Sequence, residues 1–155
     1  MVRAECVTLA ACYRARCLAL SIVRGRQVLE VRCHRIPGGY RSRRVLQDLV
    51  RGLLSDYAID HIVVEAGQPL TTIASALDER TEPLSLATAK RCILGAGRPK
   101  HDTLFLKLLA EHPQLQRLVT VLPGTRRIAT SERRKTVQLL SVALALAGEE
   151  LLRHE

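Results

Sequence analysis

Short apolar runs alternate with polar links along the first part of the chain. Residues 5–12 and 17–23 are apolar and prone to form strands, and a polar link at residues 13–16 separates them. A tight polar turn at residues 24–26 follows, and residues 27–35 alternate between apolar and polar side chains. A period of two is typical of a half-buried strand, and short links join antiparallel neighbours. This stretch therefore predicts an antiparallel three-strand meander.

The alternation in residues 27–35 also predicts which side chains share a face of the third strand. Successive side chains on a strand point to opposite faces of the sheet. One predicted face carries Val28, Glu30, Arg32 and His34, and the other carries Leu29, Val31 and Cys33.

Later segments change to the period of a helix and then return to that of a strand. Apolar residues spaced three and four apart predict an amphipathic helix over residues 46–57, with Ser42 as its expected N-cap. An apolar run then ends on Glu65, which predicts a strand buried on both faces. Residues 113–130 match neither period clearly, although residues 118–122 could form a strand. The other expected elements are a helix over 70–77, a strand over 83–86, and helices over 87–94, 102–111 and 132–152.

The order of these elements predicts the fold class. A meander, a helix, an inner strand, a further helix and strand, and later helices follow the chain order of the ribonuclease H-like fold. We therefore expect one α/β domain over residues 1–155, with a mixed central sheet that joins the antiparallel meander to parallel strands, and with helices on both faces. A chain of 155 residues, 47% of them hydrophobic, is long enough to bury a sizeable core.

Charge and cysteine content narrow the class of partner and the compartment. Lys and Arg outnumber Asp and Glu by 24 to 15, and the resulting charge of +9 favours polyanions, nucleic acid first. The five cysteines include no CxxC pair, so reduced thiols are expected and a zinc site is not. No signal peptide and no membrane-spanning apolar run can be recognised, so we expect a cytoplasmic protein without a membrane partner.

Glu65 is the first candidate functional residue. It stands at the carboxyl end of an expected inner strand, which is where open α/β sheets collect their ligands. The alternative is a strand-end carboxylate that faces water and has no function.

Two stretches of the sequence carry a resemblance to a known family. The first is IVVE at residues 62–65, and the second is AKRCILGAGR at residues 89–98, which leads into an expected helix. Together they resemble the RuvC-type Holliday junction resolvases, which are nucleases of the ribonuclease H-like superfamily. The resemblance spans about residues 5–150.

The resemblance implies roles for individual residues. Glu65 matches the catalytic Glu at the end of a family strand, and Lys90 matches a Lys that contacts DNA. The glycines of the family's loop fall on Gly95 and Gly97. The next loop Lys of the family falls nearest to His101, with Lys100 one place earlier.

The other acids of the family are missing from this chain. The first-strand Asp falls on Ala11, and two acids of the last helix fall on Gln138 and Ser141. Two-metal phosphodiester cleavage requires several carboxylates around two divalent ions, so Glu65 alone is too little. We therefore expect a degenerate active site with no metal and no cofactor, and Mg²⁺ or Mn²⁺ only if nuclease activity survives. Acids that could restore a metal site under another alignment are Glu5, Asp60, Asp102, Glu111 and Glu132.

Three groups of cations carry the binding hypothesis. Glycine amides next to cations can approach phosphates closely, and the few aromatic residues argue against stacking on single-stranded bases. Contacts with the backbone of duplex or branched DNA are therefore favoured, and the alternative is an ordinary solvated basic surface. The groups are Arg41, Arg43 and Arg44; Lys90, Arg91, Arg98 and Lys100; and Arg126, Arg127, Arg133, Arg134 and Lys135.

These observations favour a non-catalytic protein that binds branched or duplex DNA and that could act as a homodimer. Two alternatives stay open. One is a metal-dependent endonuclease that uses Glu65 with other acids, and the other is a protein-binding scaffold or regulatory subunit. Salt dependence of binding separates the first reading from the scaffold, and the number of carboxylates around Glu65 separates the nuclease from both.

Overall fold

The computed structural model describes six segments of the chain. The described residues are 6–14, 17–35, 40–66, 81–95, 101–118 and 133–153. The helix expected over residues 70–77 lies outside these ranges, as do residues 119–122 of the strand considered above. Within the described ranges, no helix is long and apolar enough to cross a bilayer.

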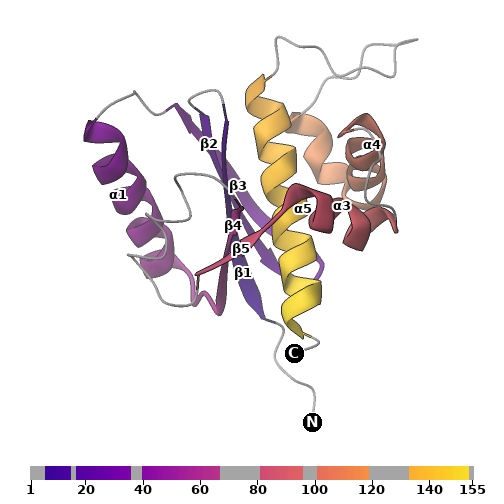
Figure 1. Cartoon of the computed structure of the whole chain (residues 1–155), viewed down its shortest axis with the longest axis horizontal. Helices are drawn as coiled ribbons and strands as arrows, with labels where there is room; N and C mark the ends of the chain where they lie inside the picture. Colours follow the sequence, from indigo (N-terminus) through magenta and orange to yellow (C-terminus); the bar gives the residue numbers. More distant parts are fainter. Residues whose placement is uncertain are drawn as a thin grey trace.

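A five-stranded mixed sheet forms the centre of the fold (Figure 1). Across the sheet the strand order is β3-β2-β1-β4-β5. The β1–β2 and β2–β3 pairs are antiparallel, whereas the β1–β4 and β4–β5 pairs are parallel. The predicted meander joined to parallel strands is therefore confirmed. The strands are β1 (Val7–Arg14), β2 (Cys17–Arg24), β3 (Gln27–Arg35), β4 (His61–Glu65) and β5 (Thr81–Leu84).

Helices cover both faces of the sheet, as the sequence predicted. Figure 1 shows α1 on one face, α5 against the other face, and α3 and α4 on the outer side of α5. Residues 139–145 of α5 are all buried, which explains why this stretch is apolar on every side apart from Ser141. The helices are α1 (Tyr40–Asp56), α3 (Leu86–Leu94), α4 (His101–Glu111), the short 3₁₀ helix η1 (Pro113–Leu118) and α5 (Arg133–Arg153).

Each face of the sheet has its own hydrophobic core. Alternate residues of β1 point to opposite faces, so Ala10 and Cys12 join the core under α5, whereas Leu9 and Ala11 join the core under α1. The inner strand β4 contributes to both cores in the same way, as expected for a strand that is covered on both faces.

β3 departs from strict alternation at one point. Ile22 lies opposite Glu30, while the next residue of β2 lies opposite Val28, so Leu29 is an extra residue on β3. A β-bulge of this kind turns the following side chains relative to the preceding ones. Val28 therefore packs in the core under α5, and Leu29 packs in the core under α1. The predicted faces of these two residues were wrong.

Several element boundaries also differ from the prediction. β5 spans Thr81–Leu84, whereas a strand was expected over residues 83–86. The first strand continues to Arg14, two residues beyond its expected end at Cys12. α1 begins at Tyr40, so Ser42 lies inside the helix and is not its N-cap. Pairing with β2 extends the strand, because Arg14 lies opposite Cys17 across the hairpin, and local sequence does not reveal such pairing.

Gly148→Ala should destabilise the protein. A Cβ at Gly148 would lie 2.6 Å from Cγ2 of Val63, and this branched side chain has little freedom to rotate away. Overpacking of this kind costs roughly 1–3 kcal/mol, which denaturant unfolding would measure. Gly52→Ala in α1 is the control, because nothing lies within 4 Å of its Cβ and helix propensity should stabilise it by about 0.5–1 kcal/mol. Equal effects of Gly148→Ala and Gly52→Ala on stability would contradict close packing of α5 on β4, because both substitutions gain the same helix propensity.

Candidate functional site

Glu65 lies at the carboxyl end of β4, as predicted, but its side chain does not face water. The residue is 5% exposed. Because β4 runs parallel to β1 with Val64 opposite Ala11, the next residue of β1, Cys12, comes beside Glu65. The alternative of a solvated strand-end carboxylate was therefore wrong.

Arg14, the last residue of β1, holds the Glu65 carboxylate at two points. Nε of Arg14 donates to Oε2 of Glu65 at 3.3 Å, and Nη2 donates to Oε1. The Glu65 side chain is 7% exposed and the Arg14 side chain is 39% exposed. The pair therefore has a buried anionic end and a cationic end that reaches solvent. A two-point contact fixes the plane of the guanidinium as well as its position.

The thiol of Cys12 completes the surroundings of the carboxylate. Its Sγ donates to Oε2 of Glu65 at 3.1 Å. Burial raises the pKa of Cys12, and the negative charge of Glu65 raises it further. The thiol therefore stays protonated at neutral pH. It acts as a hydrogen-bond donor, since nucleophilic attack and metal binding both require the thiolate.

Lys90 brings a second cation toward the same place. Its helix, α3, starts after Ser85, whose Oγ accepts the N–H of Thr88 at 3.1 Å as the N-cap. Burial lowers the pKa of Lys90, and the positive charge of nearby Arg14 lowers it further. Cys12, Arg14, Glu65 and Lys90 are called the Glu65 cluster below. One carboxylate and two cations give this cluster a net positive charge.

The end of α3 is held by two contacts that do not involve a ligand. Gly95 adopts a left-handed backbone conformation with φ of 76°, and its N–H donates to the carbonyl of Arg91 at 2.8 Å. This conformation favours glycine, so helix termination is sufficient to explain Gly95. Nζ of Lys107 in α4 donates to the carbonyl of Ile93 at 2.6 Å. Together these contacts set where the chain leaves α3.

The residues aligned with the missing family acids do not surround Glu65. Ala11 lies in the core under α1, on the opposite face of the sheet, and Cys12 takes the place beside Glu65 instead. Ser141 is buried under β2, where its Oγ donates to the carbonyl of Gln138 at 2.6 Å and bonds Oγ of Ser21. Neither helix residue contacts the Glu65 carboxylate in the part of the chain that the structure describes.

Five of the other predicted DNA contacts lie outside the described residues. Arg91 is exposed on α3, one residue from Lys90. Arg44 is exposed on α1. Six further predictions fall on described backbone whose side chains are not described: Arg41 and Arg43 in α1, His101 at the start of α4, and Arg133, Arg134 and Lys135 in the first turn of α5. The predictions that fall outside the described residues are Gly97, Arg98, Lys100, Arg126 and Arg127.

The acids considered as substitutes are placed elsewhere wherever the structure describes them. Asp60 precedes β4, at the opposite end from Glu65, and its Oδ2 accepts the N–H of Val7 at 2.8 Å. Glu111 lies in α4 and pairs with Lys107 at 3.8 Å. The side chains of Glu5, Asp102 and Glu132 lie outside the described part.

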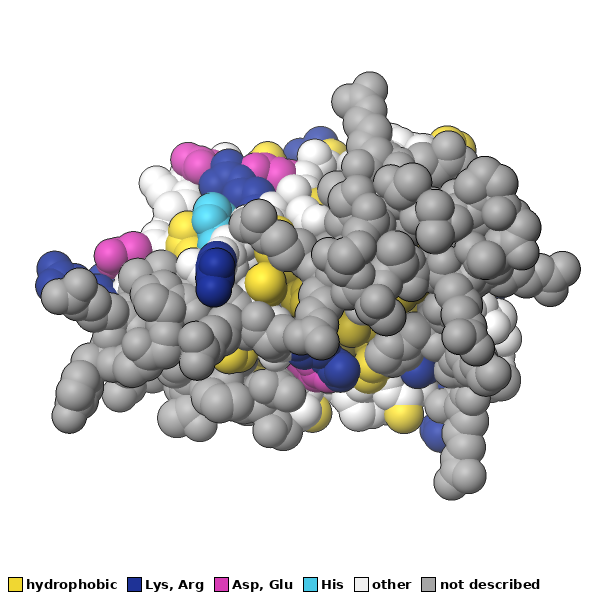
Figure 2. Space-filling model, turned by 90° about the horizontal axis from the view of Figure 1, so that it is seen from above, with side chains coloured by type: hydrophobic (Ala, Val, Ile, Leu, Met, Phe, Trp, Pro, Cys, Tyr) yellow, Lys and Arg dark blue, Asp and Glu magenta, His cyan; other side chains and the backbone are white. Residues whose placement is uncertain are grey.

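Cations also occur elsewhere at this end of the molecule. Figure 2 shows the molecule from above relative to Figure 1. This view faces the end of the sheet toward which β1 and β4 run. Among the described residues on this face, Lys and Arg side chains lie at several separate points, and acidic side chains lie beside some of them. The described surface alone therefore does not form one continuous basic patch.

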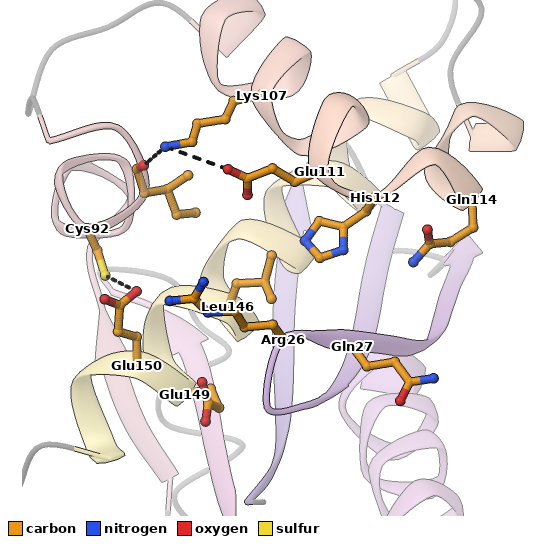
Figure 3. A pocket seen from close by; sticks show the side chains of 11 residues that line it. Arg26, Gln27, Cys92, Lys107, Glu111, His112, Gln114, Leu146, Glu149 and Glu150 are labelled. Carbon is orange, nitrogen blue, oxygen red and sulfur yellow. Dashed lines mark hydrogen bonds and ion pairs between the residues drawn. The ribbon is translucent and has the colours of Figure 1, made fainter.

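A hollow lies between α3, α4, α5 and the β2–β3 turn (Figure 3). Its volume is about 740 Å³, and it shares no residue with the Glu65 cluster. Sγ of Cys92 contacts Oε2 of Glu150 at 3.5 Å, and burial, followed by the charge of Glu150, raises the pKa of Cys92 to about 11. Arg26, Lys107 and His112 also line it. This mixture of acids and bases selects no particular ligand.

Comparison with solved structures identifies the fold. RuvC from Thermus thermophilus superposes on this chain with a TM-score of 0.69, covering 96% of each chain at 14% sequence identity. T. thermophilus RuvC in complex with a Holliday junction substrate gives a TM-score of 0.58, covering 94% of this chain and 98% of that chain at 12% identity. The chain has the fold of RuvC. No family model and no curated protein sequence matches it. The predicted ribonuclease H-like fold is confirmed.

The RuvC fold raises the question of whether the Glu65 cluster fits a divalent cation. Mg²⁺ and Mn²⁺ require several oxygen ligands. Both oxygens of Glu65 already accept hydrogen bonds from Arg14 or Cys12, and the charges of Arg14 and Lys90 oppose a cation. Within the described ranges, no three His, Cys, Asp or Glu side chains are grouped to hold a metal. The described residues around Glu65 therefore do not fit a metal site.

Sequence reasoning missed Arg14 and Cys12 as partners of Glu65. The polar link expected at residues 13–16 ended the first strand before Arg14. Extending the strand by two residues puts Ala10, Cys12 and Arg14 on one face, since side chains two apart point the same way. That alternation is the signal that could have found the pair.

Substituting Arg14 alone should destabilise the fold more than substituting Arg14 and Glu65 together. Arg14→Gln leaves the buried Glu65 carboxylate without its cation, whereas Arg14→Gln with Glu65→Gln leaves two neutral amides. Solvent screens the exposed part of Arg14, so we expect a cost of about 1–2 kcal/mol for the single change, below the ~3–5 kcal/mol of a fully buried pair.

Denaturant unfolding of both single variants and the double variant forms a double-mutant cycle. We expect the double variant to recover at least half of the loss seen in Arg14→Gln. Arg24→Gln, an exposed position at the far end of the same hairpin, is the control and should change stability by less than about 0.5 kcal/mol. Additive effects at positions 14 and 65 would show that the pair contributes no coupling energy.

Proposed function

We propose that this chain binds nucleic acid and does not cleave it. The observation that carries the proposal is the two-point ion pair between Arg14 and Glu65. It engages the carboxylate that a metal-dependent nuclease would need, and it leaves a partly exposed guanidinium whose positive charge acts on Lys90. Such a site attracts an anion and repels a divalent cation.

The ligand class follows from charge and fold. The formal charge of +9 favours a polyanion, and the likeness to RuvC, one structure of which contains a Holliday junction, supports DNA among polyanions. Tyr and Phe are too few to provide a stacking surface for single-stranded bases. We therefore propose that the ligand is duplex or branched DNA, held mainly through its phosphates. Homodimer formation and a cytoplasmic location stay predictions.

The proposal is tested by titrating a four-way junction, a duplex and a single strand of equal length. We expect the junction and the duplex to bind more tightly than the single strand. Each phosphate contact adds about 0.9 to the slope of log affinity against log salt, so three contacts should weaken binding roughly 40-fold between about 50 and 200 mM salt. Light scattering of the free chain in the same buffers measures the predicted homodimer.

Parallel samples with Mg²⁺ or Mn²⁺ separate the alternatives. The proposal predicts intact DNA in every sample. Cleavage that disappears in Glu65→Gln would favour the metal-dependent nuclease and overturn the non-catalytic part of the proposal. The absence of salt-dependent binding to all three forms would overturn the binding part and favour a protein-binding scaffold.

Lys90→Ala should weaken binding to the junction and the duplex by similar factors. A phosphate contact carries no sequence information, so its loss acts uniformly, and we expect a decrease of roughly 5- to 10-fold at about 0.1 M salt. Arg51→Ala is the matched control. Arg51 is exposed on α1, so its substitution removes the same positive charge on the opposite face of the sheet. A filter-binding or fluorescence-anisotropy titration measures both. Equal losses in the two variants would mean that net charge alone explains the effect.

A further inference from the structure

We propose that the Arg14 guanidinium is itself a phosphate-binding group, which Glu65 orients to receive one DNA backbone phosphate together with Lys90. This inference rests on the proposed function. It adds a contact residue that the sequence did not indicate, and it gives Glu65 a positioning role in place of a catalytic one.

The hydrogen bonds of Arg14 leave one edge of its guanidinium available. A guanidinium has five N–H donors in a rigid plane. Nε and Nη2 each direct one donor to Glu65, and these two bonds use neither Nη1 nor the second donor of Nη2. The edge formed by Nη1 and the second donor of Nη2 therefore points away from Glu65, and its two parallel N–H groups match two oxygens of a phosphate.

The buried half of the pair makes this orientation stable. The Glu65 side chain is 7% exposed, and Cys12 also donates to its Oε2 at 3.1 Å, so the carboxylate is held by the strand and by a second donor. Arg14 is 39% exposed, so its available edge lies at the solvent boundary. A preorganised donor loses less conformational entropy on binding than a freely moving arginine does.

The charges of the Glu65 cluster also call for an anion. Arg14 lies close enough to Lys90 for its positive charge to lower the pKa of Lys90, after burial as the larger cause. Glu65 compensates one of these two charges and leaves the other. A phosphodiester between Arg14 and Lys90 carries one negative charge, so it would neutralise the cluster and relieve the repulsion between the two cations.

The test uses a double variant that keeps the net charge of the protein. Arg14→Gln with Glu65→Gln removes one positive and one negative charge, so long-range attraction to DNA is unchanged. The matched control is Arg32→Gln with Glu30→Gln, which removes the Arg–Glu pair of β3 on the α1 side of the sheet. Circular dichroism melts establish that both double variants are folded before binding is compared.

The readout is the salt dependence of duplex and junction binding. We expect the Arg14/Glu65 double variant to lose about 0.9 from the slope of log affinity against log salt, and roughly 8-fold in affinity at about 0.1 M salt. The Glu30/Arg32 variant should keep the wild-type slope. An unchanged slope in the Arg14/Glu65 variant, with the wild type still binding in a salt-dependent way, overturns this inference and leaves the proposed function standing. A wild type without salt-dependent binding overturns the proposed function itself.

The single substitution Glu65→Gln distinguishes two roles of Glu65, which either orients Arg14 or only repels DNA. If Glu65 only repelled DNA, Glu65→Gln would tighten binding, because it removes a negative charge near the phosphates. If Glu65 orients Arg14, the weaker amide contact should offset that gain, and we expect an affinity no higher than that of the wild type. Tightening of 5-fold or more would overturn the positioning role.

Arg14→Lys replaces the double variant in the binding test if the double variant does not fold. Lysine keeps the positive charge but lacks the planar fork of arginine, so the affinity of this variant for DNA should fall several-fold.

Discussion

A carboxylate buried at the end of an inner strand must be compensated by donors or by a cation, and this constraint organises the functional end of the molecule. Glu65 is compensated by Arg14 and Cys12, both from the neighbouring parallel strand. The pair joins the carboxyl ends of β1 and β4, which adjoin in the sheet through their parallel register. Because a buried charge without a partner is costly, neither residue can be exchanged freely without the other.

The layers around the sheet hold this pair in place. α5 packs so closely on β4 that a glycine, Gly148, lies against Val63, and its buried residues close the face of the sheet that carries Cys12 and Arg14. α3 packs on the outer side of α5 and places Lys90 near Arg14. Thus the Glu65 cluster depends on three separate elements, β1, β4 and α3, whose positions are decided by hydrophobic packing.

The charges of the Glu65 cluster differ from those of a site built for divalent cations. A site that holds divalent cations needs several carboxylates facing one another, whereas the Glu65 cluster combines one carboxylate with two cations. The likeness to RuvC concerns the backbone, and 14% identity leaves the side chains at this site free to differ. Function has to be argued from the side chains at the site, because a shared fold does not carry it.

The sequence by itself determined the class of fold, the succession of elements, the buried strand that ends on Glu65 and the helix that carries Lys90, because periodicity is a local property of the chain. It did not determine the partner of Glu65, the opposite faces of Val28 and Leu29, or the distance between Ser141 and the site. Those features depend on strand pairing and helix packing. Arg14 and Glu65 are 51 residues apart, and only the parallel register of β1 with β4 brings them together. Tertiary structure decided the chemistry of the site because hydrogen bonds and ion pairs across a sheet join residues that have no local relation in the sequence.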